Sequence, residues 1–392
     1  MTSPRPTARA PRTHRDGVQR VFLHIGAPKT GSTYLQQALW RNRAALAEGG
    51  VCYPLDSEHA HFAAALDVSR RPWGGSWNPE WDGAWDRVCG NIRTSTGHLA
   101  VFSDELFGLA SPAQAAAAVR SLRPAEVHLV FTARDLARQI SADWQEQIKH
   151  RHTVPFRRFV DDLVRCGIDA PEPFGELFWG LHDPVYVLDK WCDAVPPERI
   201  HLITGPRSTA PRELLWRRFA TTVGIDPDAY DVEVDLDNRT MGLVEAEFFR
   251  RFNLATREQM SRHHGPVLNR VLGQAILSRR PGSQPIRLPA EHAEWARQRS
   301  ALMRDELIAR GFDIVGDPDE LIPQQDDAVP QEDPEKFPPS AINAVAYDAV
   351  AGLVDQVVSL RGRARNLAAW IEDRERGAVD RLDKMHRGDE PR

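Results

Sequence analysis

An apolar run, a glycine-rich turn and a helix-like stretch follow one another directly in residues 21–39, VFLHIGAPKTGSTYLQQAL. A turn of this kind presents backbone N–H groups and the positive end of a helix dipole to an anion. Lys29 adds a mobile positive charge, and Thr30, Ser32 and Thr33 add hydroxyl donors. The segment therefore predicts a strand–loop–helix corner that binds a phosphate-like group.

Three further apolar runs have the same strand-like character, and helix-like stretches separate them. They are residues 98–103, 126–133 and 199–205. Short apolar strands that alternate with helices indicate a parallel sheet covered by helices on both faces. The pattern is helical from about 237 to 311, and we expect these helices to pack on the same α/β core.

The sequence predicts four parts. Residues 1–19 are basic and proline-rich and contain no apolar core of a secretory signal, so we expect a disordered leader, with an arginine-rich transit peptide as the alternative. Residues 20–316 form the α/β domain. Residues 317–340 are acidic and proline-rich, which is typical of a linker. Residues 341–392 form a helical tail, either a coil that binds a partner or a helix docked on its own domain.

The composition excludes several function classes. The 392 residues carry a net charge of −5, which argues against a nucleic-acid partner. The four cysteines are widely spaced, so they predict neither a metal site nor a disulfide framework. We find no stretch close to the roughly 18 apolar residues of a membrane span. A cytoplasmic location follows by default.

A second segment, residues 129–147, predicts another anion contact. A strand leads into Arg134, and a helix follows that carries Ser141 seven residues later. These two side chains lie on one helical face or converge from the strand end. A guanidinium can bind two phosphate oxygens at once, although a lone arginine after a strand is most often a surface ion pair.

Both segments resemble motifs of one enzyme family, the sulfotransferases that use 3′-phosphoadenosine 5′-phosphosulfate (PAPS). Residues 28–33, P-K-T-G-S-T, are similar to the family's 5′-phosphosulfate loop, P-K-[TS]-G-[TS]-T. The second segment is similar to the family pattern R-[DN]-P-x-x-x-x-x-S, with Leu136 where proline is usual. The resemblance spans about 20–240, and residues 238–253 look like a segment of uncharacterised bacterial members.

The resemblance implies a three-layer αβα fold with a central parallel sheet and a P-loop-like topology, extended by the C-terminal helices. It implies in-line transfer of a sulfuryl group from PAPS, without a metal, to an acceptor that we expect to be a hydroxyl. Lys29 would contact the oxygen that bridges the sulfuryl group and the 5′-phosphate. Thr30, Gly31, Ser32 and Thr33 would hold the 5′-phosphate. Arg134 and Ser141 would hold the 3′-phosphate.

Two aspects of such an enzyme are not assigned by the resemblance. The family's C-terminal K-G-x-x-G-x-W-K loop is not found in this sequence, so the residues that bind adenine are unassigned. The acceptor is a small molecule, a sugar or a lipid, and the oligomeric state is open.

The acceptor hydroxyl must lose a proton, so a general base is expected opposite the nucleotide. Glu105 follows the apolar run 98–103 in the sequence S-D-E-L-F, which resembles an S-x-E segment of bacterial members. We predict Glu105 as the base. His61 is the main rival because it titrates near neutrality, and Asp104 is a weaker one that could instead cap a helix.

Two other functions fit part of the pattern. In a P-loop phosphotransferase or NTPase the loop reads G-x-x-x-x-G-K-[ST], and Gly26 and Gly31 have that separation. Asp104 would then organise Mg²⁺ at the end of a Walker B strand. However, Ser32 stands where that lysine belongs, and the lysine lies inside the loop at position 29. A non-catalytic nucleotide-binding protein is the third reading, and Lys29 argues against it.

Overall fold

The computed structural model describes residues 18–171, 173–211, 213–233, 240–260, 264–324 and 333–386, and of 377–386 only the backbone. The chain divides into two compact units. The first consists of the chain up to Gln147 with Val154–Asp237 and Ile286–Asp333, and the second of Ile148–Thr153, Asn238–Pro285 and the chain from Pro334 onward. Residues 1–17, most of the predicted leader, lie outside the described part.

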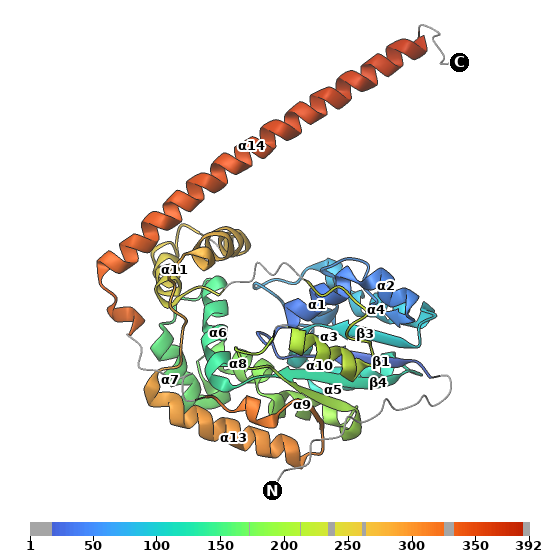
Figure 1. Cartoon of the computed structure of the whole chain (residues 1–392), viewed down its shortest axis with the longest axis vertical. Helices are drawn as coiled ribbons and strands as arrows, with labels where there is room; N and C mark the ends of the chain where they lie inside the picture. Colours follow the sequence, from blue (N-terminus) through green and yellow to red (C-terminus); the bar gives the residue numbers. More distant parts are fainter. Residues whose placement is uncertain are drawn as a thin grey trace. The chain divides into compact units, whose positions relative to one another are not determined.

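The first unit is built on a six-stranded sheet of order β2-β3-β1-β4-β5-β6, and all neighbouring strands are parallel (Figure 1). Four of the strands match the predicted apolar runs, and the short strands β2 and β6 were not predicted. The strands are β1 Arg20–His24, β2 Val51–Cys52, β3 Leu99–Ser103, β4 Glu126–Ala133, β5 Ile200–Thr204 and β6 Asp313–Val315.

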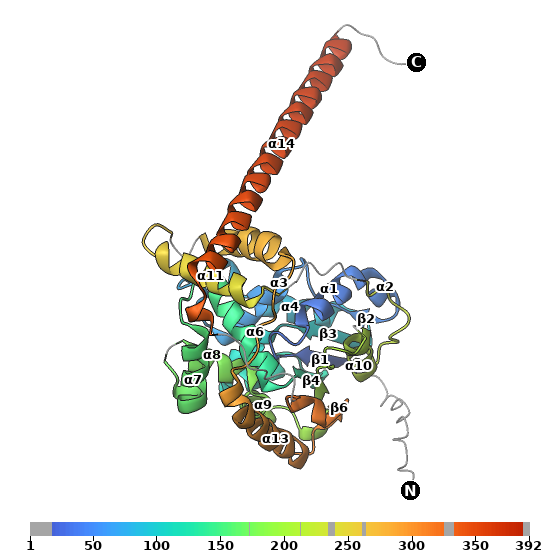
Figure 2. The same ribbon diagram turned by 60° about the vertical axis from the view of Figure 1, so that its left-hand side comes forward.

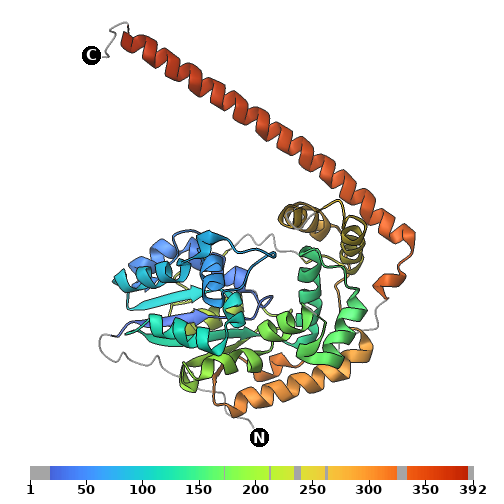
Figure 3. The same cartoon turned by 180° about the vertical axis from the view of Figure 1, so that it is seen from behind.

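Helices cover both faces of this sheet, as the view from behind in Figure 3 also shows. The prediction of a three-layer αβα fold with a central parallel sheet is therefore confirmed. The helices of the unit are α1 Ser32–Arg41, α2 Arg43–Glu48, α3 Ala60–Ser69, α4 Ala84–Thr94, α5 Pro112–Ser121, most of α6 Leu136–Lys149, α7 Phe156–Cys166, α8 Phe174–His182, α9 Pro184–Cys192, α10 Glu213–Val223 and α13 Ala293–Ala309.

Strand β1 lies in the middle of the sheet, and its register brings three strand ends together. Arg20 is paired with Leu99 of β3 on one side and with Glu126 of β4 on the other. Residues 21–24 are all buried, as expected for a strand covered on both faces. The segments that follow β1, β3 and β4 therefore leave the sheet at the same edge, where parallel α/β sheets bind ligands.

Pairing between β1 and β4 continues beyond the end of β1 into the glycine-rich loop. The N–H of Ile25 donates to the carbonyl of Val130 at 3.0 Å, and that of Ala27 to the carbonyl of Thr132 at 2.8 Å. At Gly26, between them, φ is +148°, and a Cβ would lie 2.7 Å from the ring of the buried Phe131. Only glycine fits there, so the close approach of the loop to β4 depends on it.

The helical segment predicted from 237 to 311 does not pack on the α/β core as one block. Helix α11, Leu243–Ala255, belongs to the second unit, and α13 belongs to the first. The second unit also contains α12 Gly265–Leu268, the π-helical segment η6 Asn269–Ile276 and the long α14 Pro339–His386. The helices α11 and α13, expected on one core, therefore fall in different units, and α11 and η6 pack against α14 within the second unit.

The acidic segment expected as a linker, 317–340, is ordered where the structure describes it. Pro318–Leu321 form a 3₁₀ turn, Leu321 is fully buried, and Glu320 pairs with Arg218 of α10 at 2.6 Å. Pro334–Lys336 form another turn, and α14 begins at Pro339. Residues 325–332 lie outside the described part. The buried ion pair explains why residues 317–324 belong to the first unit.

Helix α14 differs from a second expectation of the sequence analysis. Among the described residues, its part Pro339–Arg376 is long and apolar enough, by length and composition alone, to cross a membrane. No such stretch was expected. Length and composition alone do not assign a membrane span to α14.

Candidate functional site

The predicted phosphate-binding loop connects β1 to α1 and is held in shape by its own side chains. The hydroxyl of Thr30 donates to the carbonyl of Ala27 at 2.7 Å and also contacts the hydroxyl of Thr132 on β4. Gly31, the N-cap of α1, has a left-handed backbone with φ +106°. It has no side chain, so no side-chain oxygen caps the first turn of α1. The backbone N–H groups that begin this helix suit an anion.

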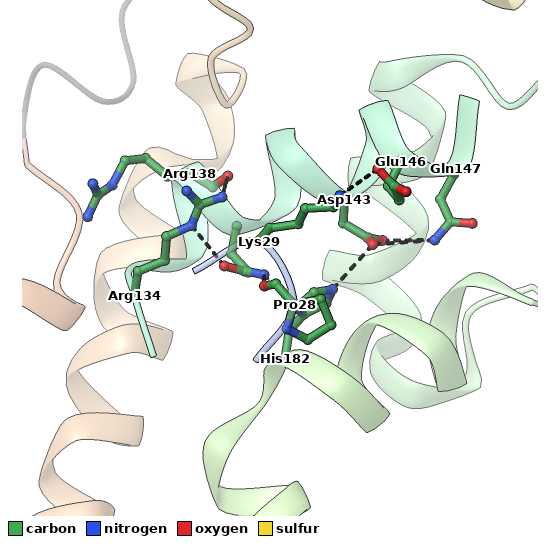
Figure 4. Close-up of polar contacts among 9 residues, drawn as sticks. Pro28, Lys29, Arg134, Arg138, Asp143, Glu146, Gln147 and His182 are labelled. Atoms are coloured by element: carbon green, nitrogen blue, oxygen red, sulfur yellow. Dashed lines mark hydrogen bonds and ion pairs between the residues drawn. The ribbon is translucent and has the colours of Figure 1, made fainter. Parts of the chain in front are cut away.

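Lys29 leaves the loop towards helix α6. Its Nζ forms an ion pair with Oε2 of Glu146 at 2.5 Å, and both side chains are partly exposed (Figure 4). Lys29 also has a left-handed backbone, with φ +63°, which a residue with a Cβ seldom adopts. Glu146 was not singled out by the sequence, because nothing there indicates that the third turn of α6 reaches the loop.

A single glutamine joins the two predicted anion-binding segments. Arg134, directly after β4, donates through Nε to Oε1 of Gln139 at 2.9 Å. The amide Nε2 of Gln139 in turn donates to the carbonyl of Pro28 at 2.7 Å (Figure 4). Arg134 and the P-K-T-G-S-T loop are therefore held in one fixed arrangement.

Arg134 is a half-buried cation whose two hydrogen-bond acceptors are neutral. They are the amide oxygen of Gln139 and, at 2.9 Å, the carbonyl oxygen of Arg138. Burial lowers the pKa of Arg134 to about 10, while the nearby charge of Asp135 acts in the opposite direction. Even so, the guanidinium is charged at neutral pH. A partly desolvated cation bonded to neutral groups is a natural site for an anionic ligand.

Further buried side chains on α6 and α8 support Gln139. Its Nε2 also donates to Nδ1 of His182, and Nε2 of His182 donates to Asp143 at 3.2 Å (Figure 4). Gln147 donates to both carboxylate oxygens of Asp143. These bonds require a neutral His182 with its proton on Nε2. This series of hydrogen bonds fixes the side-chain amide of Gln139, which connects Arg134 to the loop.

The structure places Ser141 on α6 but directs its hydroxyl elsewhere. Ser141 is buried, and its Oγ donates to the carbonyl of Ala137 at 3.0 Å, one turn earlier on the helix. Of the predicted pair, Arg134 is tied to the loop through Gln139, whereas the hydroxyl of Ser141 bonds to the backbone of its own helix.

Glu105 lies beside the first turns of α1, at the start of the 3₁₀ turn η2, Glu105–Leu109, that follows β3. Its Oε2 accepts a hydrogen bond from the amide of Gln36 on α1 at 3.2 Å. Burial, followed by the negative charge of Asp104, raises the pKa of Glu105, and the charges of Lys29 and His61 act in the opposite direction. Glu105, the predicted base, is thus close enough to Lys29 for their charges to interact. Lys29 is the residue predicted to assist the leaving group.

His61 and Asp104, the two rival candidates for the base, are bonded to each other. Nδ1 of His61, on α3, lies 2.7 Å from Oδ2 of Asp104. Burial acts to lower the pKa of His61, but the hydrogen bond and charge of Asp104 outweigh it and raise the pKa above 6.5. Burial and the charge of Asp104 also raise the pKa of Tyr53, a residue that the sequence did not indicate.

The role of Asp104 in the P-loop phosphotransferase hypothesis is not supported by these contacts. Its Oδ1 accepts the N–H of Leu106 at 2.8 Å and thereby caps η2, as the sequence analysis allowed. Its other oxygen bonds to His61. Because both carboxylate oxygens already have protein partners, Asp104 is a poor candidate for organising Mg²⁺.

No protein-family model and no curated protein matches this chain. A match among solved structures is the crystal structure of a sulfotransferase from Alicyclobacillus acidocaldarius. The two chains are 16% identical, the match covers 61% of this chain and 94% of the other, and the TM-score is 0.37. A likeness this distant carries no argument, so the interpretation of the site rests on its own residues.

The His61–Asp104 pair makes a prediction that needs no knowledge of the substrate. In a titration followed by NMR, the imidazole of His61 should have a pKa above 6.5, and Asp104→Asn should lower it because a charged partner is lost. His128, whose pKa burial lowers to about 4, serves as the reference in the same spectra and should not change. An unchanged His61 in the Asp104→Asn variant would show that the pair is not formed.

Proposed function

We propose that the protein transfers a sulfuryl group from PAPS to the hydroxyl of a small molecule, a sugar or a lipid. One arrangement carries the proposal: the P-K-T-G-S-T loop and the half-buried Arg134 are tied together by Gln139 at one edge of the sheet. PAPS carries anionic groups at both its 5′ and 3′ positions. Two anion-binding elements held at a fixed separation suit a ligand of that kind.

The residues present fit the donor. The uncapped first turn of α1 supplies N–H groups for the 5′-phosphate, next to Thr30, Gly31, Ser32 and Thr33. Arg134 would bind the 3′-phosphate, which would add an anionic partner to the neutral acceptors, Gln139 and the carbonyl of Arg138, that this half-buried guanidinium already has. Ser141 could join it only by giving up its bond to Ala137.

PAPS supplies a sulfuryl group attached through oxygen to a good leaving phosphate. The acceptor oxygen forms a bond to sulfur as the bond between sulfur and the bridging oxygen breaks, which releases 3′,5′-adenosine bisphosphate. Lys29 meets the negative charge that develops on the bridging oxygen. The proton of the acceptor hydroxyl passes to a carboxylate, for which we propose Glu105.

The electrostatics favour Glu105 over His61 as the base. Because Asp104 raises the pKa of His61, its imidazole stays protonated to higher pH than that of an ordinary histidine, and a protonated imidazole cannot accept a proton. Its positive charge instead stabilises the carboxylate of Glu105. The raised pKa of Glu105 makes it a stronger base than an ordinary glutamate.

The first test measures nucleotide binding by calorimetry. The protein should bind 3′,5′-adenosine bisphosphate roughly 10- to 100-fold more tightly than AMP, the worth of a charge-assisted contact of about 1.5–3 kcal/mol. Arg134→Ala should abolish the difference, whereas Arg120→Ala, on the exposed end of α5, should retain it. Equal affinities in the wild type would refute a 3′-phosphate site.

A second test measures transfer itself and identifies the acceptor. Incubation with radiolabelled PAPS and a metabolite extract should give a labelled product, which mass spectrometry can identify. Lys29→Ala should then lower turnover by about 10²–10³-fold while weakening bisphosphate binding less, because the lysine acts on the breaking bond. Glu146→Gln removes the carboxylate that pairs with Lys29 but leaves the charge of Lys29 itself, so this variant should retain turnover. If Lys29→Ala lost only affinity, the lysine would be a clamp.

A third test assigns the base. Glu105→Gln keeps the shape and the contact with Gln36 but cannot take a proton, so turnover should fall by roughly 10²–10⁴-fold with bisphosphate binding unchanged. In the wild type, activity requires the ionised carboxylate, so it is present at higher pH and is lost as the pH falls through a midpoint above 4.5. A midpoint above 6.5, together with an active Glu105→Gln variant, would assign the base to His61 instead.

A further inference from the structure

Helix α14 has an apolar side that its own unit does not cover. Over its first turns, Val345 and Ala349 are buried against the second unit, and Asp348 pairs with Arg280 at 2.7 Å. A Cβ on Gly352 would lie 2.9 Å from Ile276, so the packing is still close at that point. From Leu353 to Arg376 the large side chains are exposed. Figure 2 shows α14 extending well beyond α11, the other long helix of the unit.

Tyr347, Val354, Val358 and Trp370 are exposed elsewhere on α14, but the other large exposed apolar residues follow a seven-residue repeat. They recur at alternating spacings of three and four, and the large ones are between 40% and 60% exposed. We refer to them as the seam: Val350, Leu353, Val357, Leu360, Ala364, Leu367 and Ile371. In heptad terms the first, third, fifth and seventh occupy a positions, and the leucines between them occupy d positions. This is the sequence signature of a coiled coil.

We propose that the seam pairs with the seam of a second copy of this chain in a parallel two-stranded coiled coil. β-Branched residues at a with leucine at d favour two parallel strands, and Val350, Val357 and Ile371 are β-branched. A self-complementary stripe of this kind identifies its occupant as the same helix. Arg374 holds the next d position, which sets the C-terminal limit of the seam.

The seam is not the face that docks on the second unit. The docked positions Val345, Ala349 and Gly352 form one stripe, and the seam begins at Val350, about 100° around the helix from Ala349. The docked stripe ends at Gly352, and the seam residues from Leu353 onward lie beyond it. A second copy can therefore bind without displacing the contacts within the unit.

The surroundings of α14 argue against the membrane span that its composition allows. The apolar stretch includes Asp348, which is paired with Arg280, and Asp355. Arg361, Arg363 and Arg365 follow directly after Leu360. The uninterrupted exposed apolar part is thus far shorter than the roughly 20 residues that a spanning helix needs.

The proposal is tested on the full chain by sedimentation and light scattering. The wild type should be a dimer. Val357→Asp, which places a charge in the seam, should give a monomer with retained helical circular dichroism. The matched control is the neighbouring Val358, which is exposed to a similar degree but lies outside the seam, and Val358→Asp should remain a dimer. A monomeric wild type, or equal effects of the two substitutions, would overturn the proposal.

The parallel register has its own test. Val357→Cys and Leu367→Cys lie ten residues apart, about 15 Å along the helix, and each should form a disulfide with its own counterpart under mild oxidation. Val358→Cys and the wild type give the background from the natural cysteines, which include the exposed Cys166. Cross-linking at only one of the two seam positions would exclude the parallel pairing. Flotation of the wild type with phospholipid vesicles, lost equally in Val357→Asp and Val358→Asp, would indicate a lipid surface instead. None of these readouts depends on sulfuryl transfer.

Discussion

Strand β1 is hydrogen-bonded along both edges, and the candidate site depends on this constraint. At the end of β1, the ring nitrogens of His24 contact the hydroxyl of Ser103 on β3 at 2.8 Å and the hydroxyl of Thr132 on β4 at 3.2 Å. Burial lowers the pKa of His24 to about 4, so the ring is neutral at neutral pH and can donate at one nitrogen and accept at the other. Thr132 then contacts Thr30 in the loop. The three strand ends and the loop thus form one rigid edge.

At this edge of the sheet, positive and negative side chains lie close enough for their charges to interact. Asp104 and Glu105 are adjacent in the chain, and the negative charge of Asp104 raises the cost of charging Glu105. His61 and Lys29 offset that cost with two positive charges. A carboxylate in such a cluster can remain ionised near neutrality and still be basic enough to accept a proton. The protonation of Glu105 is therefore coupled to that of His61.

The sequence predicted the parts of the site that depend on local chain order, and not those that depend on packing between helices. The loop and Arg134 could be found because a strand, a turn and a helix place them without help from distant residues. Gln139, His182 and Glu146 could not, since their roles arise only when α6 and α8 pack beside the loop. The short strands β2 and β6 carry too few residues for an alternation to be seen. The division of the helices after 237 between two units could not be predicted, because a helical period does not identify the surface on which a helix packs.

The backbone of Lys29 links the rigidity of the edge to the chemistry proposed for it. A left-handed conformation at a residue with a Cβ costs roughly 1–2 kcal/mol, so the neighbouring contacts must hold it. Thr30 bonds back to Ala27 on one side, and Gln139 holds the carbonyl of Pro28 on the other. Without an anion, Glu146 compensates the lysine's charge. In the proposed reaction, a nucleotide bound at the loop would offer the same ammonium a stronger set of negative charges in place of Glu146, and the preformed loop would not need to reorganise as the bond to sulfur breaks.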